Sequence, residues 1–192
     1  KKLSHQQLRD ELDKLGAALG SGGGQAGATF SIQAKRDTLP GALEILRQVL
    51  REPTLPADQF DILKREGLAQ LEQSKTEPQA LATRQLARQV NPFPKDDIRY
   101  VPTIEESIER LRATTPEQVT TLYREFLGSQ AGELTIVGDF DTDACLPILT
   151  ETLRGWKGAK PYARIVAKVT GDGTGSHHTI KTPDKANANF YS

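Results

Sequence analysis

The chain contains 192 residues, and its 25 basic and 25 acidic side chains give a net charge of +0 at pH 7. This length predicts one domain with a buried core and at most part of a second domain. The balanced charge gives no electrostatic reason to expect a nucleic acid or an anionic membrane as partner, and no apolar run approaches the ~20 residues that span a bilayer.

The first fifty residues predict a helix, a glycine-rich turn, a strand and a second helix, in this order. Ser4 and Gln7 have the spacing of a capping box, and Gly16 interrupts the helical repeat that follows, which contains Leu8, Leu12, Leu15 and Leu19. Apolar and polar residues alternate over residues 28–35, which predicts a half-buried strand. Thr38 and Pro40 open the second helix, with an apolar stripe of Leu43, Leu46, Val49 and Leu50. The N-terminal residues show neither the charged nor the apolar region of a secretory signal peptide. The start directly on a helix cap suggests an excised fragment.

Further helices and one more strand are predicted over residues 54–156. Helices begin after Thr54 and Pro56, at Thr103 and at Thr115, and Pro78 restarts or kinks the first of them. The inner face of the first is predicted from its apolar spacing as Phe60, Leu63, Leu68 and Leu71. A short strand over Glu133–Val137, a turn over Gly138–Asp143 and a last helix over Leu146–Trp156 complete this region.

A change of composition near residue 158 predicts a domain boundary. Residues 1–158 form the predicted domain, and residues 159–178 lose helical spacing and contain glycines among polar residues, as interdomain linkers do. Residues 179–192 are then expected to begin a second domain.

Cys145 is the only cysteine, so no internal disulfide is possible. This fits a reducing compartment, and equally a periplasmic protein that avoids cysteine. We interpret Cys145 as a small apolar residue on the helix after Asp141, because a nucleophilic thiol needs a basic partner and no histidine lies nearby in the sequence.

Two segments imitate ligand-binding loops without the required context. Residues 22–27 have the letters GxGxxG, but a dinucleotide site needs a strand before them and a helix after them, so a flexible turn is predicted. The aspartates at 139, 141 and 143 resemble the start of a calcium loop, whose sixth and twelfth positions hold Ala144 and Thr150 instead of Gly and Glu. A turn and a helix cap explain these aspartates.

The three histidines do not have the spacing of a metal site. His177 and His178 are adjacent, and adjacent side chains on an extended segment point to opposite sides. His5 lies alone in the first predicted helix. Zinc-binding histidines on a helix stand at i and i+4, so we expect no metal site at these residues.

Several segments in a fixed order resemble the M16 family of zinc peptidases, the pitrilysin and insulinase type. Residues 8–56, LRDELDKLGAALGSGGGQAGATFSIQAKRDTLPGALEILRQVLREPTLP, are similar to the segment that follows the metal-binding helix of that family. The resemblance continues through residues 100–128, YVPTIEESIERLRATTPEQVTTLYREFLG, and residues 133–141, ELTIVGDFD. It covers Leu3–Trp156, and TPDKANANFYS at the end resembles the opening strand of the family's next domain.

The resemblance implies a zinc site, but outside this chain. Active M16 peptidases carry His-x-x-Glu-His, in which the histidines bind zinc and the glutamate activates a water. This motif is absent from the sequence, and its helix would lie just upstream of Lys1. The third ligand is a glutamate before a recurrent proline, and the equivalent position counted back from Pro78 is Gln70.

Gln70 is a poor zinc ligand, because a neutral amide offers only a weakly binding carbonyl oxygen. Gln70 is then either an exposed helix residue without a role or the remnant of a lost metal site. A register shift of two residues would place Glu72 at this position instead. We assign no catalytic, cofactor-binding or metal-binding residue to this chain.

The fold implied by the resemblance is α+β: an M16/LuxS-like metallohydrolase sandwich, with an antiparallel-rich sheet packed on one side by helices. The implied function is that of a non-catalytic half-domain, which helps to enclose and position a peptide for a zinc site in another half of a metalloendopeptidase. The partners are then other M16 domains of the same polypeptide and the peptide substrate, and the location is the periplasm. Two alternatives stay open: a scaffold subunit without a proteolytic role, and an active M16 domain truncated upstream.

Overall fold

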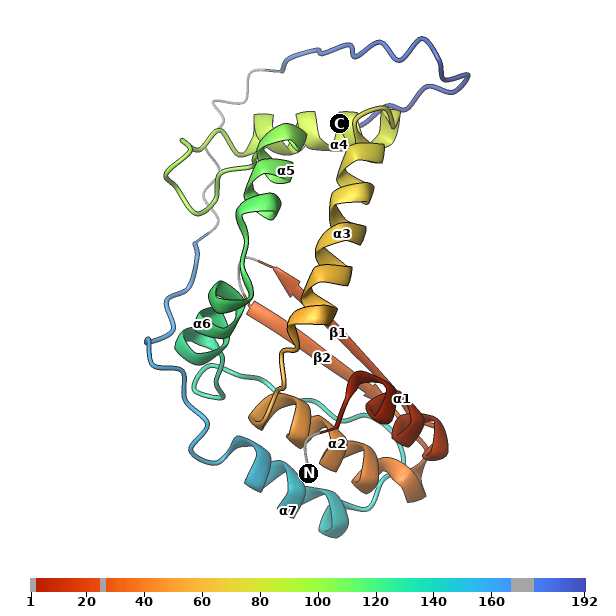
Figure 1. Cartoon of the computed structure of the whole chain (residues 1–192), viewed down its shortest axis with the longest axis vertical. Helices are drawn as coiled ribbons and strands as arrows, with labels where there is room; N and C mark the ends of the chain where they lie inside the picture. Colours follow the sequence, from red (N-terminus) through yellow and green to blue (C-terminus); the bar gives the residue numbers. More distant parts are fainter. Residues whose placement is uncertain (1–2, 25–26, 167–174) are drawn as a thin grey trace. The chain divides into compact units, whose positions relative to one another are not determined.

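The computed structural model of the protein describes residues 3–24, 27–166 and 175–192. The chain divides into two compact units, each made from two separate stretches of sequence. Unit 1 comprises Lys1–Pro56 and Glu117–Arg164, and unit 2 comprises Ala57–Pro116 and Ile165–Ser192. Figure 1 shows the helices and strands of both units, coloured along the sequence.

Unit 1 begins with helix α1 (His5–Lys14), and its capping box is confirmed. The Ser4 hydroxyl accepts a hydrogen bond from the Gln7 N–H at 3.2 Å, and the Gln7 side chain accepts one from the Ser4 N–H at 3.0 Å. Gly16 follows the helix with a φ of +58°, a left-handed conformation in which glycine avoids a Cβ clash. The helix therefore ends before Leu19, which the leucine repeat had placed on it.

The glycine-rich segment after α1 is a strand as far as Gly24, so the predicted turn over residues 22–27 was wrong for residues 22–24 and for Gly27, which begins the next strand, while residues 25–26 of that prediction lie outside the described residues. Strand β1 (Ala18–Gly24) pairs antiparallel with β2 (Gly27–Gln33), from Ala18 opposite Gln33 to Gly24 opposite Gly27. The hydrogen bonds from β2 hold β1 extended despite the low strand propensity of glycine. A Cβ on Gly20 would lie 2.7 Å from the Ser31 hydroxyl, so a larger residue there would require the Ser31 side chain to rotate away.

The core of unit 1 lies between helices α2 (Leu39–Arg51) and α7 (Thr142–Leu153), which pack against each other (Figure 1). A 3₁₀ turn (Arg36–Thr38) precedes α2, and α6 (Pro116–Phe126) begins at the boundary between the units. The centre of the core consists of Leu43, Cys145 and Leu149. Around them pack the partly buried side chains of Ile32, Leu39, Ile136, Phe140 and Ile148.

The strand predicted over Glu133–Val137 does not form in the structure. A strand needs a neighbour that accepts and donates its hydrogen bonds, and among the described residues β1 and β2 pair only with each other. The segment still contributes Ile136 to the core, while Val137 is 91% exposed. The ion pair from Arg36 Nη1 to Asp139 Oδ1, at 2.6 Å, joins the end of this segment to the turn after β2.

Unit 2 contains α3 (Ala57–Ser74), α4 (Pro78–Val90) and α5 (Ile104–Ala113). Helices α3 and α5 approach closely at Gly67, where a Cβ would lie 3.1 Å from Leu111 Cδ2. The Lys64 ammonium donates to the carbonyl oxygens of Arg112 and Thr114, at 2.7 and 2.8 Å, where the dipole of α5 favours a cation. The predicted helix starts are confirmed, but Leu63 is 66% exposed and does not belong to the inner face of α3.

The described residues thus form an α+β structure of helices with one small antiparallel sheet. Leu12, Ala42, Ile104 and Ile108 are buried on the helices, with Ile108 only 2% exposed. None of the described helices is both long and apolar enough to cross a membrane.

Candidate functional site

The candidate position Gln70 lies on α3 with its side chain exposed. Its carbonyl oxygen accepts a hydrogen bond from the Ser74 hydroxyl at 2.8 Å, one helical turn along. The alternative position, Glu72, forms ion pairs with Lys75 at 2.6 Å and with Arg112 at 3.3 Å. The hydrogen bond from Lys75 lowers the pKa of the Glu72 carboxyl. Glu72 is therefore engaged with cations of its own unit, whereas Gln70 faces a surface hollow.

This hollow lies along the C-terminal part of α3 and the adjoining α4, within unit 2. Half of its ten lining residues are polar and uncharged, two are charged and three are apolar. The lining residues are Gln70, Gln73, Ser74, Glu77, Gln79, Ala80, Thr83, Arg84, Ala87 and Val101. The sequence pointed to one of these positions, Gln70, and gave no sign that α4 would complete the hollow beside it.

Arg84 connects the hollow to a cluster of polar side chains between α4, α5 and the segment that joins them. Its Nη1 donates to the Pro102 carbonyl oxygen at 2.9 Å and lies 3.3 Å from the Ser107 hydroxyl. One helical turn further along α4, Arg88 donates to the Val101 carbonyl oxygen at 2.6 Å and to the Tyr100 hydroxyl at 3.3 Å. The two arginines hold the joining segment against α4.

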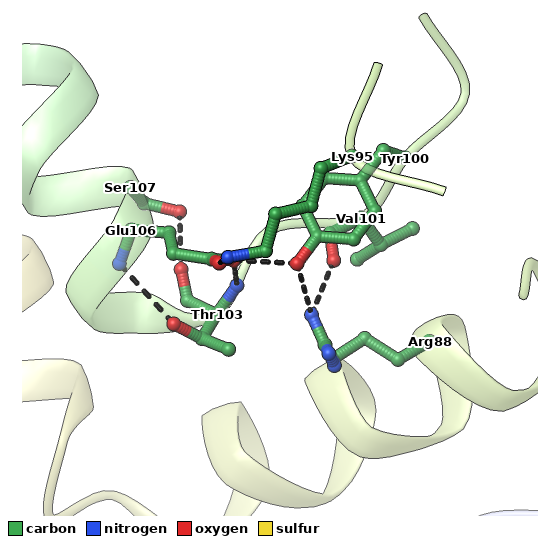
Figure 2. A network of polar contacts seen from close by, with 7 residues as sticks. All are labelled: Arg88, Lys95, Tyr100, Val101, Thr103, Glu106 and Ser107. Atoms are coloured by element: carbon green, nitrogen blue, oxygen red, sulfur yellow. Dashed lines mark hydrogen bonds and ion pairs between the residues drawn. The ribbon is translucent and has the colours of Figure 1, made fainter. Parts of the chain in front are cut away.

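Glu106 is the centre of this cluster (Figure 2). One carboxylate oxygen accepts from the Tyr100 hydroxyl at 2.6 Å and from the Thr103 N–H at 2.9 Å, and the other forms an ion pair with Lys95. The Glu106 N–H donates to the Thr103 hydroxyl, which completes the capping box predicted for α5. Lys95, Tyr100 and Thr103 together hold the pKa of the Glu106 carboxyl at about 2, well below its ordinary value.

The sequence analysis identified the cap formed by Thr103 and Glu106 but missed the rest of the cluster. A usable signal was present, because Arg84 and Arg88 are four residues apart and therefore share one face of α4. Two cations on one face indicate acceptors opposite them. The identity of those acceptors depends on the path of residues 91–103, which carries no helical or strand periodicity.

The pKa of Glu106 predicts a loss of stability in acid. Its folded pKa of about 2 is below the reference value of 4.5, so the contribution is complete above pH 4.5 and disappears as the pH falls toward 2. In thermal unfolding at several pH values, the melting temperature of Glu106→Gln should fall less over this interval than that of the unmodified chain. Asp97 titrates in the same range, because Arg99 lowers its pKa to about 2, so a residual slope is expected.

Glu105→Gln is the matched control, because Glu105 is the exposed neighbour on the same helix turn. It should keep the acid slope of the unmodified chain. Equal slopes in the two glutamine variants would contradict the assigned role of Glu106.

The other candidate residues have structural partners or lie on the surface. The Asp141 side chain accepts from the Ala144 N–H at 3.1 Å and caps α7, as predicted, while Asp139 pairs with Arg36. His177 and His178 are exposed. Cys145 is 1% exposed, and burial raises the pKa of its thiol, so it packs as an apolar residue and is a poor nucleophile.

The donor atoms of the described residues do not fit a zinc ion. Zinc in proteins takes thiolate, imidazole or carboxylate ligands, and Gln70 offers a neutral amide. Over residues 3–24, 27–166 and 175–192, no three His, Cys, Asp or Glu side chains gather as a ligand group. No chemical step is therefore assigned to a metal in this chain.

Comparison with known proteins finds a family model that matches part of the chain and a solved structure with a similar fold. Residues 1–94 match the family model described as "Insulinase (Peptidase family M16)". The crystal structure of a peptidase M16 inactive domain from Pseudomonas fluorescens is similar to this chain with a TM-score of 0.64 and 23% sequence identity, over 87% of this chain and 39% of the other. The chain thus spans about two fifths of that protein, and the likeness establishes the fold. No curated protein matches the sequence.

Proposed function

We propose that this chain, whose residues 1–94 match the M16 peptidase family model, is a non-catalytic domain of a larger zinc metalloendopeptidase. The observation that carries the proposal is the fold, which over 87% of the chain resembles an M16 domain described as inactive. Gln70 adds a chemical reason. It lies exposed on α3, where the family resemblance expects a zinc-binding glutamate, and its amide is a weak ligand.

A domain of this kind would act by enclosing and orienting a peptide whose bond is cleaved at a zinc site in another half of the protein. Holding an extended chain in one conformation and excluding water lower the barrier without a reacting group in the enclosing domain. The hollow beside Gln70 is a surface of unit 2 that we assign to such contact, because amide and hydroxyl side chains line it. Zinc chemistry in this proposal belongs entirely to the other half.

The proposal includes the arrangement of the parent protein. Residues 1–158 would form part of an M16/LuxS-like sandwich, residues 159–178 a linker, and residues 179–192 the first strand of a following domain. Residues 167–174 of this linker lie outside the described residues. We propose the periplasm as the location, on the family resemblance alone.

The test compares this chain with its parent polypeptide. The parent should contain stoichiometric zinc and cleave a quenched fluorescent peptide, whereas the 192-residue chain should do neither. If this chain, extended by the residues that precede it and without the other half, binds stoichiometric zinc and cleaves the peptide, the non-catalytic assignment is wrong. If the parent binds no zinc and cleaves nothing, the scaffold function replaces the peptidase function.

A further inference from the structure

The hollow of unit 2 carries hydrogen-bonding groups that the fold itself does not use. Among the described residues, none bonds to the side-chain amides of Gln70, Gln73 or Gln79, all three of which line the hollow. An amide side chain has both donors and acceptors, as a peptide backbone does. The hydroxyls of Ser74 and Thr83 donate to carbonyl oxygens of their own helices, and their lone pairs remain able to accept. This lining suits a polypeptide backbone of any sequence.

The charges at the hollow differ in how firmly they are held. The Arg84 guanidinium is hydrogen-bonded to Pro102 and Ser107, so it stabilises the fold and is less available to a ligand. Glu77, at the N-cap of α4, accepts no capping hydrogen bond and makes an ion pair with Lys185 at 2.6 Å. The carboxylate of Glu77 is thus the acidic end of the hollow, and its partner in the structure is a lysine.

This lysine belongs to a segment without helix or strand that contacts α4 at two places. The Gln89 amide donates to the Ser176 hydroxyl at 2.6 Å near the end of α4, and Lys185 meets Glu77 at its start. Residues 77 and 89 are about 18 Å apart along a helix, and the chain from 176 to 185 can extend to about 30 Å. The segment is therefore long enough to run along α4 with slack.

The contact between Glu77 and Lys185 is weak enough to open. Their side chains are 41% and 33% exposed, and exposed ion pairs contribute little because water and salt screen them. A competing polypeptide with its own lysine or arginine could therefore replace Lys185 at Glu77. The segment that contains Lys185 is itself an example of such a partner, because it has no helix or strand and places a lysine at Glu77.

We propose that the hollow along α3 and α4 is a docking groove for an extended polypeptide that carries a lysine or arginine, and that Lys185 occupies its acidic end in the free chain. This inference rests on the proposed function, which it deepens by naming the substrate class. The amides of Gln70, Gln73 and Gln79 contact the backbone, and Glu77 selects the basic side chain.

The test measures fluorescence anisotropy of a labelled peptide with the sequence of residues 179–188, TIKTPDKANA, added to the 192-residue chain at low ionic strength. Lys185→Ala in the chain frees Glu77 and should tighten binding of this peptide about 2- to 5-fold, the range of an exposed ion pair. Adding Glu77→Gln to that variant should abolish the gain. A peptide with alanine in place of its second lysine should bind these two variants with equal affinity.

Glu66→Gln is the matched control on α3, outside the residues that line the hollow, and should leave binding unchanged. A charge reversal distinguishes a lost contact from a misfolded variant. The Glu77→Lys chain should bind a peptide in which glutamate replaces the second lysine more tightly than it binds the original peptide. The proposal is overturned if adding Glu77→Gln to the Lys185→Ala variant leaves its affinity for the peptide unaltered, or if the alanine peptide binds Lys185→Ala as tightly as the lysine peptide does. The assay involves neither zinc nor cleavage, so its failure would leave the non-catalytic assignment standing.

Discussion

Replacement of Leu43 by alanine is expected to lower the free energy of unfolding of unit 1 by about 2–5 kcal/mol, the range for a large-to-small change in a packed core. Leu43 is 5% exposed and packs with Cys145 and Leu149, so α2 meets α7 through this side chain. The cavity left by alanine would remove contacts that neither helix can restore by a small movement. Trp156, the only tryptophan, lies in unit 1, and its fluorescence during urea unfolding measures the loss.

Leu122→Ala is the matched control, because it deletes the same atoms from an exposed position. Leu122 lies on α6 and is 56% exposed, so its removal should change the stability of unit 1 by about 0.5 kcal/mol or less. If Leu43→Ala costs no more than Leu122→Ala, then the cluster around Cys145 is not the core of this unit.

The helices were predictable from the sequence because their signals are local. Ser4 and Gln7 start α1, Thr103 and Glu106 start α5, and each pair forms the reciprocal hydrogen bonds that its spacing implied. A capping box depends only on residues within one helical turn, so the rest of the chain cannot alter it easily. Gly16 likewise ends α1 through its own backbone conformation.

The strands were less predictable because a strand depends on a partner that may be distant in sequence. The glycines of β1 have low strand propensity, yet pairing with β2 makes them a strand. The residues Glu133–Val137 have high strand propensity and alternate suitably, yet no strand forms there. In both cases the presence or absence of a pairing strand outweighed the strand propensity of the residues themselves.

The candidate site combines one predicted position with contacts that sequence spacing could not supply. Gln70 lies on the expected long helix, but its place in a hollow depends on how α4 follows α3 after Pro78. Leu63 illustrates the same limit, because apolar spacing placed it on the inner face while the structure leaves it exposed. Periodicity identifies a helix more reliably than it identifies what each face contacts.

The polar side chains of unit 2 form two groups with different roles. Those around Glu106 bond to one another and to backbone groups, and they hold the segment between α4 and α5 in place. Those of the hollow, Gln70 among them, leave their amides without partners among the described residues. Groups already bonded to one another favour rigidity, and groups left exposed favour contact with another molecule. Binding is therefore expected at the hollow, and structural support at the Glu106 cluster.

Tyr100→Ala should accordingly destabilise unit 2 more than any change in the hollow, by about 3 kcal/mol, as expected for an aromatic side chain lost from a core. Tyr100 is 8% exposed, and the guanidinium groups of Arg88 and Arg110 each lie 5.5 Å from its ring centre. Its hydroxyl also donates to Glu106. Because this unit contains no tryptophan, hydrogen exchange of the α4 and α5 amides is the suitable measurement.

Tyr100→Phe separates the two contributions of this side chain, because it keeps the ring near both arginines and removes only the hydroxyl. It should cost less stability than Tyr100→Ala and should raise the pKa of Glu106, since one of the hydrogen bonds that lower it is lost. Titration of the Glu106 carboxyl by NMR tests this second effect. An unchanged pKa in Tyr100→Phe would mean that Lys95 and the Thr103 N–H alone hold the carboxylate, and the cluster would then not depend on Tyr100.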